Sequence, residues 1–279
     1  MKIMTDTSAL YSPIEGEKLG IEVLPLSVTI NNKTYKEFVD IYPDEFIELI
    51  RAGGIPTSSQ PSIGCTIESF EKYPDEDIIC LNMADGVSGT YQSTLAAKNS
   101  LKIEQGEHVH VINTMTLCGP HRYLVQLALK LQKEKMSTEE IIQEIHKRIA
   151  FTKSFLIPSD FAFLKRGGRL TPLSATLGGM LKITPVLSLT EDGKRLEKFA
   201  IKKSAKSAVG EIIKCYQEMG VDKDCLIYIT HAAALERAEA FKAQIQKAFP
   251  ETTIELLPLS PVFITQGGPG CVAVQMIRK

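Results

Sequence analysis

Two short segments of the chain concentrate hydroxyl side chains beside residues that favour turns. The first, PTSSQPS, contains Thr57, Ser58 and Ser59. The second, DGVSGTYQS, contains Ser88 and Gly89. Hydroxyls at this density serve as a nucleophile, bind an anion or cap a helix, and capping is the commonest of these roles.

An anion site has a physical basis in these segments. The second segment links a predicted strand to a predicted helix, so the amides after Ser88 would point from a helix N-terminus, where the macrodipole favours negative charge. Gly86 and Gly89 allow the backbone to approach a ligand closely. The first segment also leads into a predicted helix, and its hydroxyls can donate to the same anion. Two such entrances with no base between them favour binding a carboxylate over attacking a carbonyl.

A nucleophilic serine stays open as the alternative. Such a serine needs a base within hydrogen-bonding reach, usually a histidine. Of the five histidines, only His231 directly follows a predicted strand, which is where α/β proteins place active groups. That arrangement would make the protein a serine- or histidine-dependent hydrolase or transferase with His231 as its base.

Sequence motifs for other chemistries are missing. The chain has no G-x-S-x-G elbow, no H-E-x-x-H, no P-loop and no G-x-G-x-x-G after its first strand. Its six cysteines are scattered without a C-x-x-C pair, which is typical of buried thiols in a reduced compartment. We therefore predict no bound metal and no cofactor.

Composition excludes several classes of partner. The 279 residues include 32 basic and 33 acidic side chains and no tryptophan, a balance that favours no nucleic-acid surface. The start of the chain lacks the apolar core of a signal peptide, and no run approaches the ~20 apolar residues of a membrane span. We predict a soluble cytoplasmic protein that binds no nucleic acid.

The segments that must position these groups alternate between strand and helix. Apolar runs such as DIICLNM and HVHVIN are followed by stretches of helical period. This alternation predicts a three-layer α/β/α domain with a mainly parallel sheet over residues 1–156. The rest of the chain predicts a smaller two-layer α/β domain with a mixed sheet over residues 157–279. Clefts between domains are a common place for a ligand.

Local signatures predict several turns and caps within these domains. Asn31 with Asn32 predicts a hairpin turn, and the Asp-Gly pair in EDGK predicts another. Ser62 is a candidate helix cap, and Ser137 with Glu140 forms a capping-box signature. These signals depend on neighbours a few residues apart.

Six motifs, in order along the chain, resemble those of the DegV family of bacterial fatty-acid-binding proteins over essentially the whole length. They are MTDTSA, PTSSQPS, VSGTYQS, FLKRGGRL, HAAALERA and GGPG. The resemblance implies two α/β domains with a long-chain fatty acid bound between them and no cofactor. It also implies a non-catalytic carrier that presents the carboxylate to a separate ATP-using fatty acid kinase and carries the acyl phosphate towards phospholipid synthesis. A distant likeness to dihydroxyacetone kinase substrate subunits leaves a small-ketone-binding subunit as a further alternative.

The resemblance also implies site residues. The family's carboxylate-binding threonine falls on Ser58, and its serine before Gly-Thr falls on Ser88. The frequent histidine before T-G-P-G falls on Gln266, so Ser58, Ser88 and Gln266 are expected to bind the carboxylate. Further contacts to the head group or its phosphate are expected from Arg169, Thr57, Ser59 and Gly89.

Two of the differences from the family's pattern concern charge near the expected carboxylate. Gln266 can donate a hydrogen bond but cannot carry charge. Asp85 lies in the loop before Ser88, and a carboxylate there would repel a bound anion unless it points to solvent or meets a base.

We also predict residues for the walls of an acyl tunnel and a basic surface. Candidate residues for the walls of an acyl tunnel, each of which is more often plain core, are Ile63, Phe163, Leu177, Met180, Leu181 and Phe263. A basic group forms either a solvated face or a docking surface for the kinase and, transiently, for anionic membrane headgroups. Its members are Lys165, Arg166, Lys202, Lys203 and Lys206.

Overall fold

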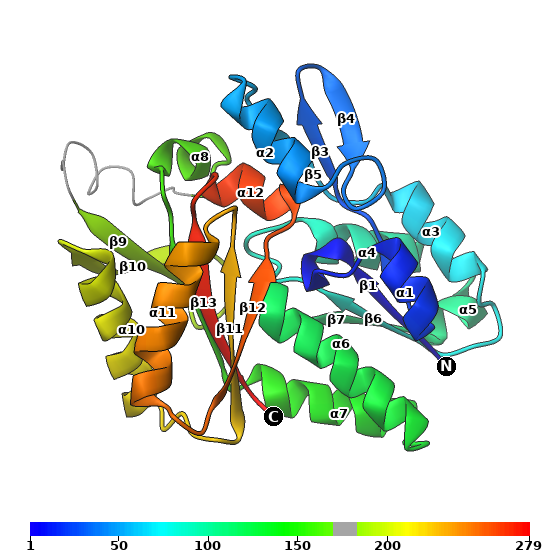
Figure 1. Cartoon of the computed structure of the whole chain (residues 1–279). Coiled ribbons are helices and arrows are strands. Elements are labelled where there is room, and N and C mark those ends of the chain that lie inside the picture. The colour runs from blue at the N-terminus through cyan, green and yellow to red at the C-terminus, as the bar shows by residue number, and fades with distance from the viewer. Residues whose placement is uncertain (170–182) are drawn as a thin grey trace.

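A four-stranded parallel sheet is the framework of the first half of the chain in the computed structural model (Figure 1). Its strands lie in the order β2-β1-β6-β7, and every neighbouring pair is parallel. Strand β6 is buried along its whole length, because helices cover both faces of the sheet. The strands are β1 (Lys2–Asp6), β2 (Glu22–Leu24), β6 (Ile78–Asn82) and β7 (Val109–Asn113).

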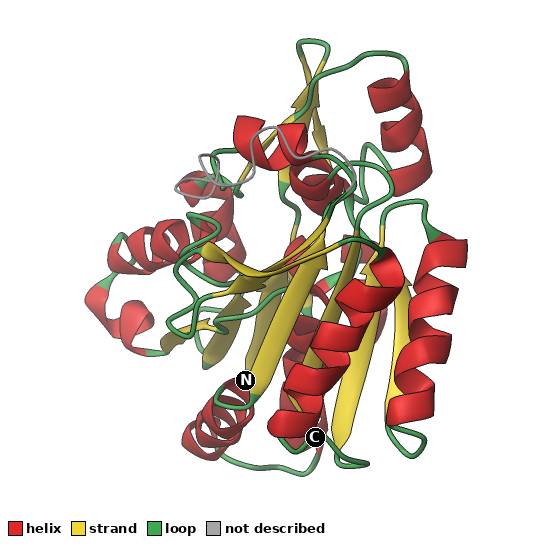
Figure 2. Ribbon diagram, turned by 90° about the vertical axis from the view of Figure 1, so that its left-hand side faces the viewer, coloured by secondary structure: helices red, strands yellow, loops and turns green. Residues whose placement is uncertain are grey.

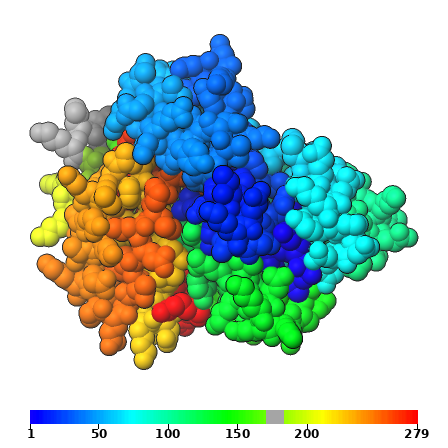
Figure 3. Space-filling view, turned by 45° about the vertical axis from the view of Figure 1, so that its right-hand side comes forward, coloured from blue at the N-terminus to red at the C-terminus, as the bar shows by residue number. Residues whose placement is uncertain are grey.

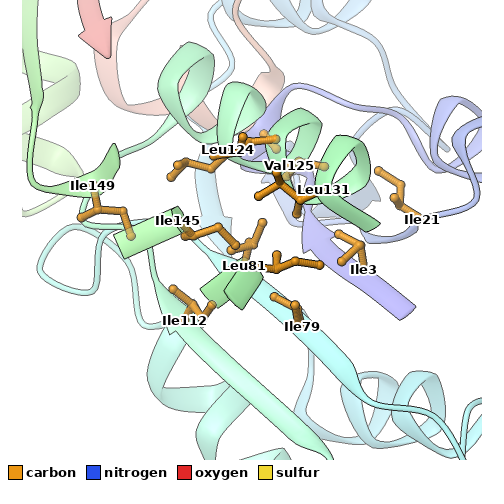
Figure 4. Close-up of a cluster of buried hydrophobic side chains, with 14 of the residues drawn as sticks. Ile3, Ile21, Ile79, Leu81, Ile112, Leu124, Val125, Leu131, Ile145 and Ile149 are labelled. Atoms are coloured by element: carbon orange, nitrogen blue, oxygen red, sulfur yellow. The ribbon is translucent and has the colours of Figure 1, made fainter. Parts of the chain in front are cut away.

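Helices pack on both faces of this sheet. On one face, α3 buries Phe70 and α4 buries Ala97 against the strands. On the other face, α6 and α7 pack over Ile79, Leu81 and Ile112 (Figure 4). The predicted three layers of helix, sheet and helix are therefore confirmed. The helical elements here are η1 (Thr7–Ala9), α1 (Pro13–Leu19), α3 (Ile63–Glu71), α4 (Thr90–Asn99), α5 (Ile103–Glu107), α6 (Cys118–Lys133) and α7 (Thr138–Ile149).

A six-stranded mixed sheet occupies the second half, in the order β10-β9-β8-β13-β11-β12. Only β11 and β12 pair in parallel; the other pairs are antiparallel. One face is covered by α10 and α11, and the other contacts α6 (Figures 1 and 2). The α/β class with one parallel and one mixed sheet is thus confirmed. The strands and helices are β8 (Thr152–Ile157), α8 (Phe161–Arg166), β9 (Thr184–Leu189), β10 (Leu196–Lys202), α10 (Ala205–Glu218), β11 (Cys225–His231), α11 (Leu235–Ala248), β12 (Thr253–Pro258), α12 (Pro261–Gly267) and β13 (Val272–Arg278).

A small antiparallel sheet, which sequence reasoning missed as a unit, joins the two halves. Its order is β4-β3-β5, and the predicted hairpin turn at Asn31 and Asn32 adopts the positive φ angles that such a turn requires. This sheet and α2 pack against α12 in one hydrophobic cluster. In Figure 3 this segment, in blue, lies across the top of both halves. The elements are β3 (Ser27–Ile30), β4 (Lys33–Lys36), α2 (Pro43–Arg51) and β5 (Thr57–Ser59).

The structure describes residues 1–169 and 183–279. Three of the candidate tunnel residues, Leu177, Met180 and Leu181, lie outside the described residues. The predicted domain boundary after residue 156 falls inside β8, and α6 contacts strands of both large sheets. The division into two domains at that residue stays a prediction.

Candidate functional site

A cavity lies where the small sheet, α12 and the face of the mixed sheet meet. Including its mouth, which is open to solvent, the space between its walls is about 960 Å³. Most of its lining is apolar and comes from segments far apart in the chain. Representative lining residues are Leu26, Met83, Leu156, Leu189, Leu196 and Phe263.

Ser58 and Gln266 form one polar contact in the wall of this cavity. Strand β5 places Ser58 opposite Val28 of β3, and the end of α12 supplies Gln266. The Gln266 amide Nε2 donates a hydrogen bond of 3.1 Å to Ser58 Oγ. Since Ser58 Oγ accepts this bond, its own proton stays available to donate to a ligand.

Gly167 allows Gln266 to take this position. A Cβ atom at residue 167 would lie 1.9 Å from Gln266 Oε1, so any larger residue would displace the amide. Gln266 Oε1 is buried and has no hydrogen-bond partner in the described part of the chain. The FLKRGGRL segment therefore supports the amide through close packing.

Ser88 lies in the lining at the entrance to α4. Its Oγ is 2.8 Å from Thr90 Oγ1 and accepts a bond of 3.3 Å from the Thr90 amide. Helix α4 begins at Thr90, and its N-cap residue Gly89 has no side chain to cap it, so N–H groups of the first turn can still bind an anion. The structure thus places Ser88 just before a helix N-terminus, as the order of strand and helix predicts. Its role in binding an anion stays a prediction.

Arg169 links the Ser88 loop to Gln266. Its Nε donates a hydrogen bond of 3.2 Å to the carbonyl of Val87, and its Nη1 donates to the carbonyl of Gly167. Val87 precedes Ser88, Gly167 packs on Gln266, and Gln266 is hydrogen-bonded to Ser58. These contacts connect the predicted polar residues at one end of the cavity, which are Ser58, Ser88, Arg169 and Gln266. Burial lowers the pKa of the Arg169 guanidinium, which still has donors left for a carboxylate.

Other predicted residues take different places. Ser59 and Phe263 line the cavity, whereas Thr57, Gly89, Ile63 and Phe163 are not in its lining. Thr57 is exposed on β5, and Phe163 packs against Gly268.

Asp85 does not face the cavity. Its Oδ2 accepts a hydrogen bond of 2.9 Å from Gln92 Nε2, and the residue is not in the lining. The repulsion expected from this carboxylate therefore has no geometric basis.

His231 is also outside the lining. It is half-buried at the end of β11, where its Nδ1 accepts a hydrogen bond of 3.3 Å from the Ala234 amide. Burial lowers its pKa. Within the described ranges it has no hydrogen bond to Ser58 or Ser88, so the pairing that a hydrolase needs is not formed.

Glu37 supports the elements that carry the site, and sequence reasoning missed it. It is fully buried at the end of β4, where its carboxylate accepts hydrogen bonds from Thr7 Oγ1 and, at 2.9 Å, from the Val262 amide. Val262 belongs to the first turn of α12, so Glu37 ties the sheet that carries Ser58 to the helix that carries Gln266. Burial raises its pKa to about 7. A charged residue near the hairpin gave no local signal of burial.

The basic residues are divided between two elements. Lys165 and Arg166 are exposed on α8, where Arg166 lies 4.5 Å over the ring of Phe163. Lys203 and Lys206 are exposed at the start of α10. Lys202 instead forms a salt bridge of 2.8 Å with Glu211.

Two further searches cover the described ranges, 1–169 and 183–279. They contain no group of three or more His, Cys, Asp or Glu side chains placed to hold a metal ion. They also contain no helix with the length and apolar character needed to cross a membrane.

Comparison with known proteins gives consistent results. The family model described as DegV matches residues 1–279. A DegV domain-containing protein from Halalkalibacterium halodurans is 31% identical over 278 residues, covering 98% of this chain and 96% of that protein.

Solved structures are similar over their full lengths. A DegV family protein from Thermus thermophilus, described by its fatty acid binding, has a TM-score of 0.89 at 25% identity and covers 100% of this chain and 99% of its own. A fatty acid binding DegV family protein from Streptococcus agalactiae has a TM-score of 0.88 at 28% identity, with 100% and 98% covered. The motifs, the fold and these matches agree: the chain belongs to the DegV family.

Proposed function

We propose that this protein binds one long-chain fatty acid, with its tail in the apolar cavity and its carboxylate at Ser58, Ser88, Gln266 and Arg169. The observation that carries the proposal is a cavity with mostly apolar walls in which Ser58, Gln266 and Arg169 are connected as a set of hydrogen-bond donors. The fatty acid binding described for the relatives from Thermus thermophilus and Streptococcus agalactiae supports it. Ser59 is near enough in the lining to assist.

The two ends of the ligand contribute differently to the binding free energy. Each buried methylene contributes roughly 0.8 kcal/mol, so a long tail supplies most of the affinity. Each hydrogen bond to a charged group contributes roughly 1.5–3 kcal/mol, which orients the carboxylate. No histidine in the ranges that the structure describes is hydrogen-bonded to Ser58 or Ser88, which supports the proposal of a carrier over that of a hydrolase.

The proposal includes a partner. The carrier presents the bound carboxylate, in the cytoplasm, to a separate ATP-using fatty acid kinase and carries the acyl phosphate towards phospholipid synthesis. The exposed Lys165, Arg166, Lys203 and Lys206 suit a docking surface for that kinase and for anionic headgroups during transient membrane contact. Lys202 contributes less to such a surface because Glu211 neutralises it.

The test of ligand class is solvent extraction of the purified protein, followed by mass spectrometry. A stoichiometric long-chain fatty acid is expected. After delipidation, Ser58→Ala and Ser88→Ala should each weaken oleate binding about tenfold. Ser100→Ala, an exposed serine at the far end of α4, is the matched control and should bind as the unmodified protein does. A folded protein that binds no fatty acid would contradict the proposal, as would ester hydrolysis that Ser88→Ala abolishes.

The test of the partner is ATP-dependent formation of acyl phosphate with a purified fatty acid kinase protein. The double variant Lys203→Ala/Lys206→Ala should raise the carrier concentration needed for half-maximal rate and leave oleate binding unchanged. Lys133→Ala, an exposed lysine on α6, is the control. Equal kinase rates for both variants would exclude the start of α10 from the docking surface.

A further inference from the structure

The cavity contains a second polar position, separate from the carboxylate end. Ser154 of β8 and Gln275 of β13 line it beside apolar neighbours. The two residues are directly opposite in the antiparallel pair of strands, two residues along from the pair Leu156 and Ala273 and on the same face of the sheet. Gln275 is 1% exposed, so this polar pair is built into the wall.

The Gln275 amide is held in one orientation. Its Nε2 donates hydrogen bonds of 3.0 Å to the Leu117 carbonyl and 3.3 Å to Ser154 Oγ. Its Oε1 accepts a longer bond, 3.4 Å, from the Gly119 amide. Both amide protons are therefore used, while Oε1 can still accept a second hydrogen bond.

The Ser154 hydroxyl has a proton without an acceptor. Its oxygen accepts from Gln275, and it donates to no other group in the part of the chain that the structure describes. An unsubstituted acyl chain covering this wall would offer it no partner, and buried polar groups in native proteins are nearly always hydrogen-bonded. A ligand hydroxyl satisfies both sides, because it accepts from Ser154 and donates to Gln275 Oε1.

The position of this pair corresponds to the middle of a tail. Cys271 packs on Gly267 at the end of α12, next to Gln266. From Cys271 the extended chain advances along the cavity through Ala273 to Gln275, about 14 Å at ~3.4 Å per residue. If the carboxylate is held near Gln266, the carbons in the middle of the acyl chain therefore lie beside Ser154.

We propose that the cavity selects fatty acids that carry a hydroxyl group part-way along the chain, and that Ser154 and Gln275 bind that hydroxyl. This inference rests on the proposed fatty acid binding. It adds a specificity site that acts on the tail and is independent of the carboxylate contacts.

The experiment titrates the delipidated protein with stearic acid and with monohydroxystearic acids that differ in the position of the hydroxyl. One mid-chain isomer should bind about three- to tenfold more tightly than stearic acid, the gain expected from one net hydrogen bond. The corresponding oxo acid, which accepts but cannot donate, should gain less. Because these ligands are tested on the unmodified protein, the result does not depend on a variant that folds.

Two variants separate the tail site from the head site. Ser154→Ala should abolish the preference, so that stearic acid and every hydroxy isomer bind the variant with similar affinity. Ser58→Ala should weaken both ligands equally and keep their ratio. Equal affinities for stearic acid and every hydroxy isomer, or a preference that survives in Ser154→Ala, would overturn the inference while leaving fatty acid binding intact. Failure of all these acids to bind would instead overturn the proposed function, and the inference with it.

Discussion

The two ends of the cavity are constructed in different ways. The head end is gathered from β5, the loop before α4, the segment after α8 and the end of α12, and single hydrogen bonds such as that between Gln266 and Ser58 connect these pieces. The tail end is a face of the mixed sheet, where Leu156 opposes Ala273 in a continuous ladder. Sites on strands are held more rigidly than sites on loops. From this difference we expect the tail end to select a ligand by length and shape, and the head end to make the more adaptable contacts with a head group or a partner.

Blocking the tail end should have the largest effect. Ala273→Phe places a ring in the cavity beside Leu156 and displaces about five methylenes of the ligand. The variant should therefore bind a C18 acid more weakly than the unmodified protein, by about 4 kcal/mol. Octanoic acid, which has fewer methylenes to lose beyond Ala273, should lose less affinity. Titration of both acids, with circular dichroism as the control for folding, checks this. Equal losses for the two acids would mean that the chain does not run along β13.

The carboxylate that holds the head end together predicts a pH dependence of stability. Burial raises the pKa of Glu37 to about 7 in the folded protein, above its ordinary value in the unfolded chain. The folded state therefore binds more protons than the unfolded state between the two values. The free energy of unfolding should fall as pH rises through this window, by about 3 kcal/mol in total.

Glu37→Gln should remove that slope. The glutamine carbonyl can accept from the Val262 amide and its NH₂ can donate to Thr7 Oγ1, as a protonated carboxyl would. Urea unfolding at pH 5 and pH 8 measures the difference, and Glu48→Gln on the exposed face of α2 is the control. An unchanged pH dependence in Glu37→Gln would show that Glu37 is ionised throughout this range.

Removing the cation at the head end should have a smaller effect that is independent of chain length. Arg169→Gln should weaken the binding of octanoic and C18 acids by the same factor, on the order of 1–2 kcal/mol, because only the carboxylate contact changes. The gain in affinity per added methylene should stay constant. A loss confined to the longer acid would place Arg169 beside the tail.

The smallest effect concerns the neutral amide. Gln266→His introduces a group that becomes charged as pH falls through about 6.5, so carboxylate binding should strengthen by about 1 kcal/mol between pH 8 and pH 6. The unmodified protein should show no such strengthening from this position. Fatty acid titration at the two pH values distinguishes them, and binding that is equally pH-independent in both would remove residue 266 from the head site.

Predictions from the sequence succeeded where the physical cause is local. Ser137 and Glu140 form the capping box that their spacing indicates, and Ser62 Oγ accepts from the Cys65 amide as a cap. The parallel and mixed sheets also follow from the order of strands and helices. The family resemblance named Ser58, Ser88, Gln266 and Arg169, and these residues do meet in one cavity. Their role in binding a carboxylate stays a proposal until it is measured.

The residues that sequence reasoning missed owe their importance to distant contacts. From the sequence, Gln275 cannot be distinguished from a polar residue of an edge strand. In the structure it is buried, because its strand lies between β8 and β11. From the sequence, Glu37 resembles a solvated charge after a hairpin. In the structure it is buried and accepts a hydrogen bond from the Val262 amide of α12.

The sequence by itself determined the class of fold, the positions of the caps and turns, and the types of side chain available to a ligand, because each depends on neighbours a few residues apart. Only the tertiary structure decided that Ser58 meets Gln266, 208 positions away, and that Ser154 lines the cavity opposite Gln275. Those contacts exist because the hydrophobic faces of three sheets and α12 are buried against one another. Burial is non-directional, so the pattern of apolar residues shows which faces are buried but not which faces meet.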